Sequence, residues 1–229
     1  MVYWLGDKEV FPSPELANEE GLLAVGGQLS EGRLLEAYSQ GIFPWFDNDD
    51  DPVMWWSPDP RLVLFPEELK ISRSMRPVLN GNAFEVTFDQ AFGEVIIACK
   101  SGFRKGQRGT WITDNMVKAY MDLHNKGWAH SVEVWHERQL VGGLYGISMG
   151  TAFFGESMFS KMSNASKIGF ITLVQWLRKR SFRMIDCQVY TSHLASLGAR
   201  EIPRTQFLTT LKECLVSPTL NGKWIYSND

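Results

Sequence analysis

Two polar side chains stand inside one otherwise apolar stretch near the end of the chain, Met184-Ile185-Asp186-Cys187-Gln188-Val189. The apolar pattern predicts a strand, and residues two apart on a strand point to the same face. A carboxylate and an amide on a buried strand are unfavourable unless they have partners. Asp186 and Gln188 are therefore candidates to bind an amine and position it for attack; the alternative is a structural polar pair that fixes a neighbouring loop.

Glu156 is a second carboxylate in apolar surroundings, within Phe153-Phe154-Gly155-Glu156-Ser157-Met158-Phe159. We weigh two interpretations for it, an ammonium-binding group and one half of a structural salt bridge. Residues 160–167, which follow, hold small polar side chains and two lysines before an expected helix. That composition is typical of an anion site, and ordinary N-capping by Ser163 or Asn164 is the alternative for those two residues.

Two proline-rich loops, residues 41–46 and 55–61, carry tryptophans close together in the sequence. Prolines restrict the backbone, and indoles held on loops suit the stacking of a flat ligand such as a nucleobase. The alternative is that these rings fill the core between two layers. A set of apolar side chains can likewise form either a ligand pocket or plain core: Leu144, Met149, Phe153, Met158, Phe170 and Ile185.

The composition indicates a globular chain with a real core, since 44% of its 229 residues are hydrophobic and 21% are charged. No apolar run approaches the roughly 20 residues of a membrane span, and the first residues do not resemble a signal peptide. Three cysteines without paired spacing indicate a reducing cytoplasm rather than a disulfide framework, and neither they nor the four histidines form a metal-ligand pattern. A net charge of −3 argues against a protein that coats nucleic acid by charge alone. Two local basic groups remain: Lys70, Arg73 and Arg76, and Lys100, Arg104, Lys105 and Arg108.

Periodicity predicts the elements that position these residues. A helix over 30–41 is capped by Ser30, another follows an Asp89 cap, a third begins at Thr113 or Asp114, and 164–180 forms a well-buried helix. Strands are expected over 61–65, 84–88 and 184–189, with a final helix over 205–215. The prolines of residues 57–60 place a domain boundary near Arg61.

Seven segments, taken together and in order, resemble the bacterial leucyl/phenylalanyl-tRNA–protein transferase family: residues 26–30, 38–45, 55–61, 109–113, 154–160, 185–189 and 196–199. The resemblance implies an α+β fold with a small N-terminal domain, residues 1–61, and an acetyltransferase-like (GNAT-like) catalytic domain, residues 62–229. It implies a cytoplasmic aminoacyltransferase. This enzyme moves leucine, phenylalanine and, less readily, methionine from aminoacyl-tRNA to the α-amino group of proteins that begin with Arg or Lys. The product is then marked for degradation by the N-end rule.

The resemblance also assigns roles to residues. Trp45 and Trp111 hold the 3′-terminal adenosine with Tyr38 close by, and Asp186 and Gln188 are the catalytic pair, with Glu156 beside them. The pocket for the donor side chain is formed by Leu144, Phe153, Met158, Phe170, Leu173 and Ile185. Two departures from the family pattern stand out: Thr191 replaces an expected Asn, and Phe170 and Leu173 exchange the large and small residues expected there. The exchange keeps a similar volume and is expected to shift the preference between leucine and phenylalanine.

An aminoacyl ester is already activated, so this reaction requires no ATP, metal or other cofactor. The enzyme must align the amine with the ester carbonyl and keep the amine neutral. On this hypothesis Asp186 accepts the proton directly or through water, and Gln188 orients the group. The acceptor stem of Leu-tRNA or Phe-tRNA is expected to contact Lys70, Arg73, Arg76, Arg104 and Lys105.

Three other functions are weighed against this one. An acyl-CoA-dependent GNAT enzyme usually carries a glycine-rich pyrophosphate loop before a helix, and Ser163 to Lys167 does not supply it. The transferases of peptidoglycan bridges have two such domains and are much longer than 229 residues. The third is a non-catalytic binder of RNA or of N-terminal residues, and Asp186→Ala separates it from an enzyme: in an enzyme, binding should survive this replacement and turnover should not.

Overall fold

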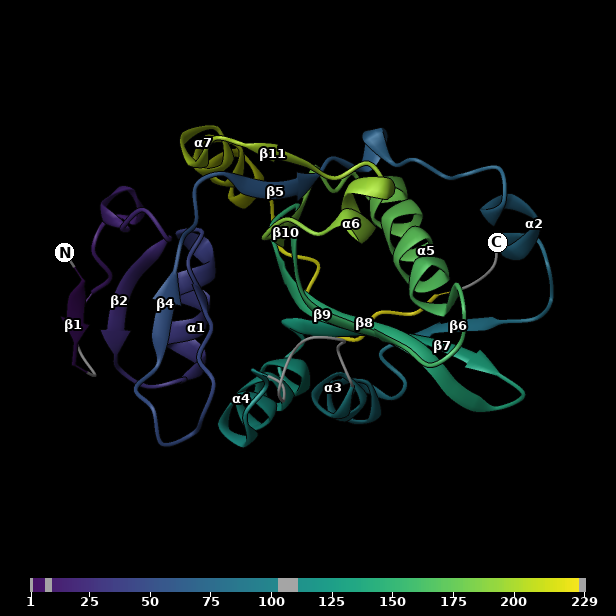
Figure 1. The fold of residues 1–229 in the computed structure, drawn as a ribbon, viewed down its shortest axis with the longest axis horizontal. Helices are drawn as coiled ribbons and strands as arrows, with labels where there is room; N and C mark the ends of the chain where they lie inside the picture. Colours follow the sequence, from purple (N-terminus) through teal and green to yellow (C-terminus); the bar gives the residue numbers. More distant parts are fainter. Residues whose placement is uncertain (1, 7–9, 103–110, 227–229) are drawn as a thin grey trace.

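The structure is a computed structural model, and it describes residues 2–6, 10–102 and 111–226. These residues form two separate sheets with helices packed on them (Figure 1). The smaller sheet has the strand order β1-β2-β4-β3, with β1 and β2 parallel and the other pairs antiparallel. Its strands are β1 (Tyr3–Leu5), β2 (Leu22–Gly26), β3 (Phe43–Pro44) and β4 (Met54–Trp56).

The larger sheet has the strand order β11-β5-β10-β9-β8-β7-β6. Adjacent strands of this sheet run antiparallel, except for β9 and β10, which run parallel. The strands are β5 (Arg61–Leu64), β6 (Glu85–Phe88), β7 (Ala129–His136), β8 (Gln139–Met149), β9 (Ala152–Ser160), β10 (Met184–Gln188) and β11 (Arg200–Ile202). The parallel pair requires a long connection, which α5 provides between β9 and β10.

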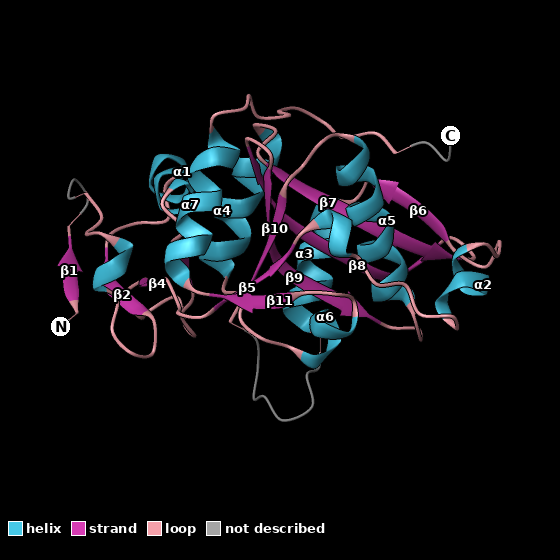
Figure 2. Ribbon diagram, turned by 90° about the horizontal axis from the view of Figure 1, so that it is seen from above, coloured by secondary structure: helices cyan, strands magenta, loops and turns pink. Residues whose placement is uncertain are grey.

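Helices cover both faces of the larger sheet. α3 and α4 lie on one face, and the long α5 lies on the other together with the short α6 (Figure 1). At the end of the larger sheet that faces the N-terminal strands (Figure 2), α1 contacts both α4 and α7, which lie on opposite sides of it in Figure 1. The helices are α1 (Glu31–Ser39), α2 (Met75–Leu79), α3 (Phe92–Ser101), α4 (Asp114–Asn125), α5 (Ala165–Lys179), α6 (Ser192–Ser196) and α7 (Arg204–Leu215).

Two apolar clusters hold the layers together. One lies on the α5 face of the larger sheet. The other runs without a break from the small sheet through α1 to α4 and the opposite face of the larger sheet. The ring of Tyr38 on α1 packs against Phe154 on β9 with their centroids 5.2 Å apart. Because this core is shared, the loops of the small sheet are held at a fixed place beside β9 and β10.

Most of the expected elements are confirmed. Ser30 and Thr113 cap α1 and α4 by accepting hydrogen bonds from the backbone N–H groups of Arg33 and Met116. The predicted cap of α3 is wrong: the residue before that helix is Ala91, and Asp89 instead accepts from the ring of His130 at 2.8 Å and from the Trp224 N–H at 2.7 Å. Sequence periodicity does not distinguish an aspartate that caps a helix from one that accepts hydrogen bonds in the core, because either can precede a helix.

The fold class, α+β with a small N-terminal domain before a larger one, is confirmed by the two sheets. The change from one sheet to the other falls between the end of β4 at Trp56 and the start of β5 at Arg61. The boundary at residue 61 stays a prediction. Across the described residues, no helix has the length and apolar character that a membrane span requires.

Candidate active site

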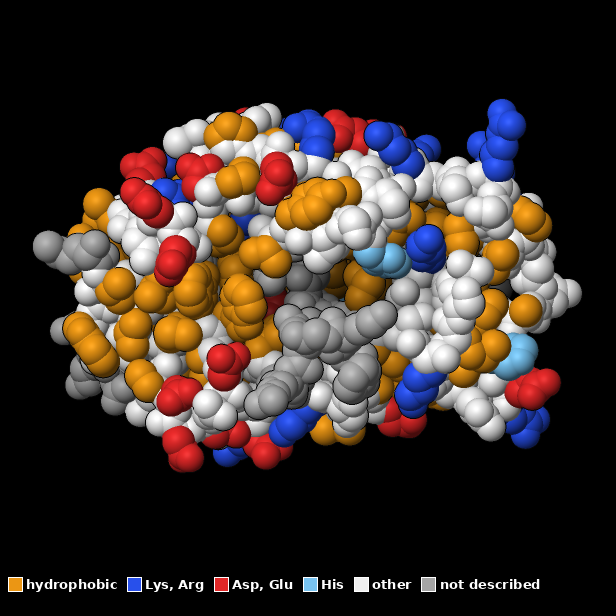
Figure 3. Space-filling model, viewed as in Figure 1, with side chains coloured by type: hydrophobic (Ala, Val, Ile, Leu, Met, Phe, Trp, Pro, Cys, Tyr) orange, Lys and Arg blue, Asp and Glu red, His pale blue; other side chains and the backbone are white. Residues whose placement is uncertain are grey.

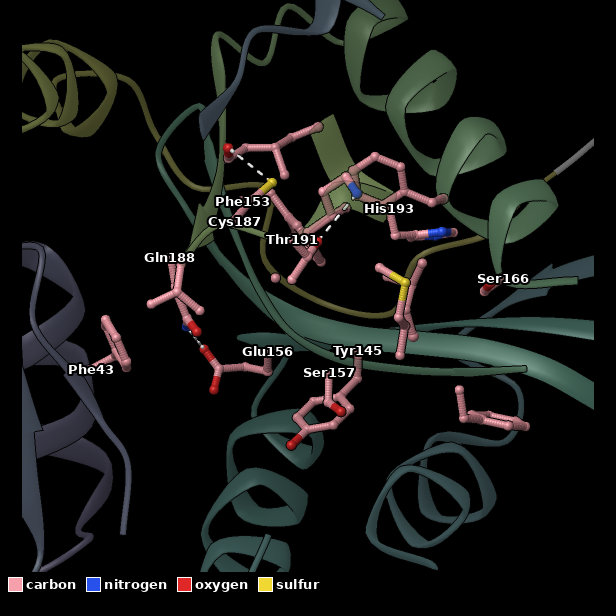
Figure 4. A pocket seen from close by; sticks show the side chains of 18 of the residues that line it. Phe43, Tyr145, Phe153, Glu156, Ser157, Ser166, Cys187, Gln188, Thr191 and His193 are labelled. Atoms are coloured by element: carbon pink, nitrogen blue, oxygen red, sulfur yellow. Dashed lines mark hydrogen bonds between the residues drawn. The ribbon is translucent and has the colours of Figure 1, made fainter. Parts of the chain in front are cut away.

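A cavity of about 710 Å³ lies where the larger sheet opens. β9 and β10 pair only from Ala152 to Phe154 and from Met184 to Asp186, while β9 continues to Ser160. Beyond the pairing the two strands separate, and the cavity occupies the space between them (Figure 4). In the space-filling view it appears as a hollow bordered mainly by apolar side chains (Figure 3).

The polar end of the cavity is built by Gln188 and Glu156. The Gln188 Nε2 amide donates a hydrogen bond to Glu156 Oε1 at 2.8 Å, and the two side chains meet across the gap between β10 and β9 (Figure 4). The Tyr120 hydroxyl on α4 donates to Glu156 Oε2 at 2.8 Å, and it also bonds the hydroxyl of Tyr38. Every oxygen of the carboxylate therefore has a partner, although both Glu156 and Gln188 line the cavity.

Burial raises the pKa of Glu156 to about 7. Hydrogen bonds from Tyr38, Tyr120 and Gln188 oppose this shift, and the nearby charge of Asp186 adds to it. Burial and the charge of Glu156 also raise the pKa of both tyrosines, so their hydroxyls stay protonated as donors. The group therefore changes its charge in the pH range where a general base is most effective.

Asp186 lies beneath the cavity and is fully buried. Its carboxylate accepts from Arg61 Nε at 2.8 Å and Nη2 at 2.6 Å, and from the backbone N–H of Gln188 at 2.9 Å. The guanidinium is held between two rings, with its Cζ 4.7 Å from the centroid of Phe43 and 4.6 Å from that of Phe207. Such a two-pronged ion pair fixes the orientation of both side chains.

The expectation that Asp186 and Gln188 share one face needs a correction. The register against β5 shifts between the two residues, and Gln188 has a φ of 62°. This bulge interrupts the strict alternation of a strand, so Gln188 lines the cavity and Asp186 does not. A positive φ at a residue other than glycine is strained, and the contacts of Gln188 with Glu156 and Asp186 hold it in that conformation.

Of the tryptophans on these loops, some are available to stack on a ligand and others fill the core. Trp45 is 37% exposed and lines the cavity together with Trp111. Trp55 is fully buried in the core, where its indole N–H donates to the Gly26 carbonyl at 2.8 Å. Trp56 donates to the Trp45 carbonyl at 2.8 Å and so fixes the loop that presents the cavity ring. Tyr38 is fully buried and does not line the cavity.

Five of the six residues expected to bind the donor side chain line the cavity: Leu144, Phe153, Met158, Phe170 and Ile185. Leu173, the sixth, is fully buried one turn further along α5 and lies outside the lining. Thr191 also lines the cavity, and its hydroxyl caps α6 by accepting from the Leu194 N–H at 3.2 Å.

The described basic residues expected to contact nucleic acid do not line the cavity. Lys70, Arg73 and Arg76 are exposed; the first two precede α2 and Arg76 lies within it. Arg104 and Lys105 lie outside the described residues. Among the residues that are described, no cluster of three or more His, Cys, Asp or Glu side chains is arranged to hold a metal ion.

Sequence reasoning missed the structural parts played by Arg61 and Tyr120. Arg61 opens an apolar strand, and a charge in that position is the natural partner for another buried charge such as Asp186. Tyr120 looks like an ordinary apolar-face residue of α4 in the sequence. Only its place opposite β9 shows that its hydroxyl reaches Glu156.

Comparisons with known proteins agree with the resemblance found in the sequence. The profile of the family described as "Leucyl/phenylalanyl-tRNA protein transferase" matches residues 63–212, and the profile of that family's N-terminal domain matches residues 27–59. The leucyl/phenylalanyl-tRNA–protein transferase of Syntrophus aciditrophicus is 57% identical over 220 residues, which are 96% of this chain and 92% of that protein. The corresponding protein of Nitrosospira multiformis is 54% identical over 231 residues, or 100% of this chain and 99% of that protein.

Solved structures show a weaker likeness. A GCN5-related N-acetyltransferase from Kribbella flavida superimposes with a TM-score of 0.34 at 8% identity, covering 79% of this chain and 63% of the other. A structure described as L-PGS from Bacillus licheniformis gives a TM-score of 0.41 at 12% identity, covering 89% and 67% of the two chains.

Proposed function

Because this chain belongs to the leucyl/phenylalanyl-tRNA protein transferase family, we propose that it transfers leucine or phenylalanine, and methionine less readily, from aminoacyl-tRNA to the α-amino group of proteins that begin with Arg or Lys. The family name supplies the aminoacyl-tRNA donor and the protein acceptor. The choice of N-terminal residue, the later degradation of the product and the cytoplasmic location are parts of the proposal.

The observation that carries the chemistry is the Gln188–Glu156 pair at the polar end of an apolar cavity. The acceptor amine attacks the ester carbonyl, a C–N bond forms, and the C–O bond to the ribose breaks. The amine must lose one proton, and the leaving ribose oxygen must gain one. Glu156 is placed to accept the proton, while Gln188 orients the amine.

Asp186 acts on this proposal as a positioning residue. Its carboxylate is occupied by Arg61 and by the Gln188 backbone, and it is fully buried below the reacting groups. By fixing the bulge at Gln188, it aims the amide into the cavity. On this proposal Glu156, and not Asp186, accepts the proton of the amine.

The cavity also offers surfaces for the side chain and the terminal adenosine of the aminoacyl-tRNA donor. The side chain of leucine or phenylalanine fits the apolar lining around Phe153 and Phe170, and the terminal adenosine stacks on Trp45 and Trp111. Tyr38 supports this site from below through Tyr120 rather than by touching the adenosine. The acceptor stem lies over exposed basic residues, among which we place Lys70, Arg73 and Arg76.

A transfer assay tests the proposal. tRNA charged with labelled leucine is mixed with the protein and with matched peptides that begin with Arg, Lys or Ala. Label is expected on the Arg and Lys peptides alone, and Glu156→Gln is expected to lower the rate by about 10²–10⁴-fold, the usual contribution of a general base. Equal labelling of the Ala peptide would refute the N-terminal selectivity, and no labelling of any peptide would refute the function.

A further inference from the structure

We propose that Lys167 and His193, with Lys161 nearby, bind the phosphodiester that precedes the terminal adenosine of the donor tRNA. The inference rests on the proposed function and assigns a ligand to two lysines and a histidine that the catalytic arrangement leaves unused. All three come from segments that surround one end of the cavity: the end of β9, the first turn of α5 and the short helix α6.

His193 presents a polar atom to the cavity without a protein partner. Its side chain lines the cavity, where Figure 4 shows it beside Thr191 and on the same side as Ser166. The Nε2 atom is shielded from solvent and has no hydrogen-bond partner in the structure. A buried ring nitrogen without a partner is unfavourable, which indicates that a ligand group completes its hydrogen bonding.

The neighbouring charges are positive and unpaired. Lys167 lies close enough to His193 to lower the pKa of the imidazole, although burial is the larger cause. Lys161 lies 5.6 Å from the ring centroid of Phe159, which lines the cavity. Within the described part of the chain, neither lysine has an acidic side chain within ion-pair distance.

Capping does not explain this polar segment. Asn164 occupies the N-cap position of α5 with a φ of 69°, and its side chain makes no capping hydrogen bond. The Ser166 N–H is instead satisfied by Ser160 Oγ at 3.2 Å. The two lysines take no part in these contacts, so their presence beside the cavity calls for another explanation.

The opposite side of the site carries negative charge. The loop after Trp45 contains Asp47, Asp49, Asp50 and Asp51. Asp49 accepts from the backbone N–H groups of Asp114 at 2.8 Å and Asn115 at 3.0 Å, which holds this acidic loop at the start of α4. Because α4 and α5 cover opposite faces of the sheet (Figure 1), a phosphate is repelled on the α4 side and attracted on the α5 side.

Two minimal donors test the assignment: phenylalanine esterified to adenosine, and phenylalanine esterified to adenosine 5′-monophosphate. The readout is the ratio of their KM values with an Arg-initiated peptide as acceptor. For the unaltered protein we expect the phosphorylated donor to have the lower KM by roughly fivefold, the size of one partly exposed charged contact. Lys167→Gln and His193→Phe are each expected to bring the ratio toward one.

Lys212→Gln is the matched control, since Lys212 is an exposed lysine on α7 away from the cavity lining. It is expected to keep the ratio of the unaltered protein. A ratio of one in the unaltered protein, or an unchanged ratio in both Lys167→Gln and His193→Phe, would overturn the phosphate site. If neither ester is used, tryptophan fluorescence titrations with AMP and adenosine decide the phosphate site without turnover, and the assay with charged tRNA decides the proposed function separately.

Discussion

At the scale of single residues, two buried carboxylates have different surroundings, and on the proposed function they have different tasks. Asp186 has a guanidinium as its partner. Glu156 has hydroxyl and amide partners, and no described cation lies within ion-pair distance of it. A carboxylate that is buried among neutral partners keeps its proton to higher pH, whereas one paired with arginine serves to hold structure.

The pH dependence of the reaction follows from Glu156. With its pKa raised to about 7, the carboxylate is protonated and inactive as a base in acid, and it becomes ionised as the pH rises through 7. We expect kcat/KM for an aminoacyl-adenosine donor to rise through this range. The acceptor α-amine also titrates, near pH 8. The pH profile of Glu156→Gln should therefore lack the ionisation near pH 7 and keep the one near pH 8. If the profile of this variant still shows both ionisations, Glu156 is excluded as the base.

The Arg61–Asp186 pair gives a prediction on stability. Asp186→Asn and Arg61→Met should each lower the free energy of unfolding by about 3–5 kcal/mol, because each leaves one buried charge without its partner. The double variant Arg61→Met/Asp186→Leu should recover most of this loss in urea unfolding, yet remain poorly active because the Gln188 bulge has lost its support. Unfolding of Asp186→Asn at the same urea concentration as the unaltered protein would contradict this account.

At the scale of elements, the site depends on the separation of β9 and β10. β8 and β9 also shift register between Tyr145 and Gly146, beside the point where the cavity begins. Gly146 pairs with Gly155 there. A Cβ on Gly146 would lie 2.2 Å from the Phe154 carbonyl oxygen and 2.6 Å from the ring of Phe153, which lines the cavity. Close packing at this glycine thus positions Phe153, a residue of the proposed donor pocket.

Gly146→Ala should therefore both destabilise the fold and disturb the pocket. We expect a loss of about 1–3 kcal/mol in the free energy of unfolding, typical of an overpacked site, and a raised KM for the donor. Gly155→Ala is the matched control for stability, since its nearest contact would be the Asp186 carbonyl oxygen at 3.5 Å. Equal unfolding midpoints for the two variants would contradict this expectation, because they would show that the backbone around residue 146 shifts to accommodate the added methyl group.

At the scale of the whole molecule, the site is assembled from both sheets. Phe43 and Trp45 come from the small sheet and its loop, while Glu156 and Gln188 come from the large one. The shared apolar core fixes the two parts relative to each other. The net charge of −3 means that a polyanionic donor must be attracted by local groups rather than by the molecule as a whole.

Salt dependence tests where the body of the tRNA lies. In the triple variant Lys70→Gln/Arg73→Gln/Arg76→Gln, the slope of log KM for aminoacyl-tRNA against log salt concentration should become shallower by about 2–3, close to one per lost phosphate contact. The KM for an aminoacyl-adenosine donor serves as the internal reference, because that donor has no phosphate. An unchanged slope for tRNA would place the acceptor stem elsewhere on the surface.

Much of the candidate site could be predicted because its signals are local. Asp186, Gln188 and Glu156 stand out as polar residues within apolar runs, and the strand and helix periods around them place each on its element. The same local signals led to the wrong cap at Asp89 and could not reveal the bulge before Gln188, since a register shift depends on the neighbouring strand. Leu173 was expected in the pocket beside Phe170, but the turn of α5 directs it into the core.

The sequence by itself determined the family, the α+β class and the residue types that supply the chemistry, because order along the chain and hydrophobic period are properties of the sequence. Only the tertiary structure decided which of those residues face the cavity. Arg61 meets Asp186 across 125 positions of sequence, and Tyr120 meets Glu156 across 36. Such pairings arise from the packing of distant elements, and this packing buries Asp186 against Arg61 while Glu156 and Gln188 line the cavity.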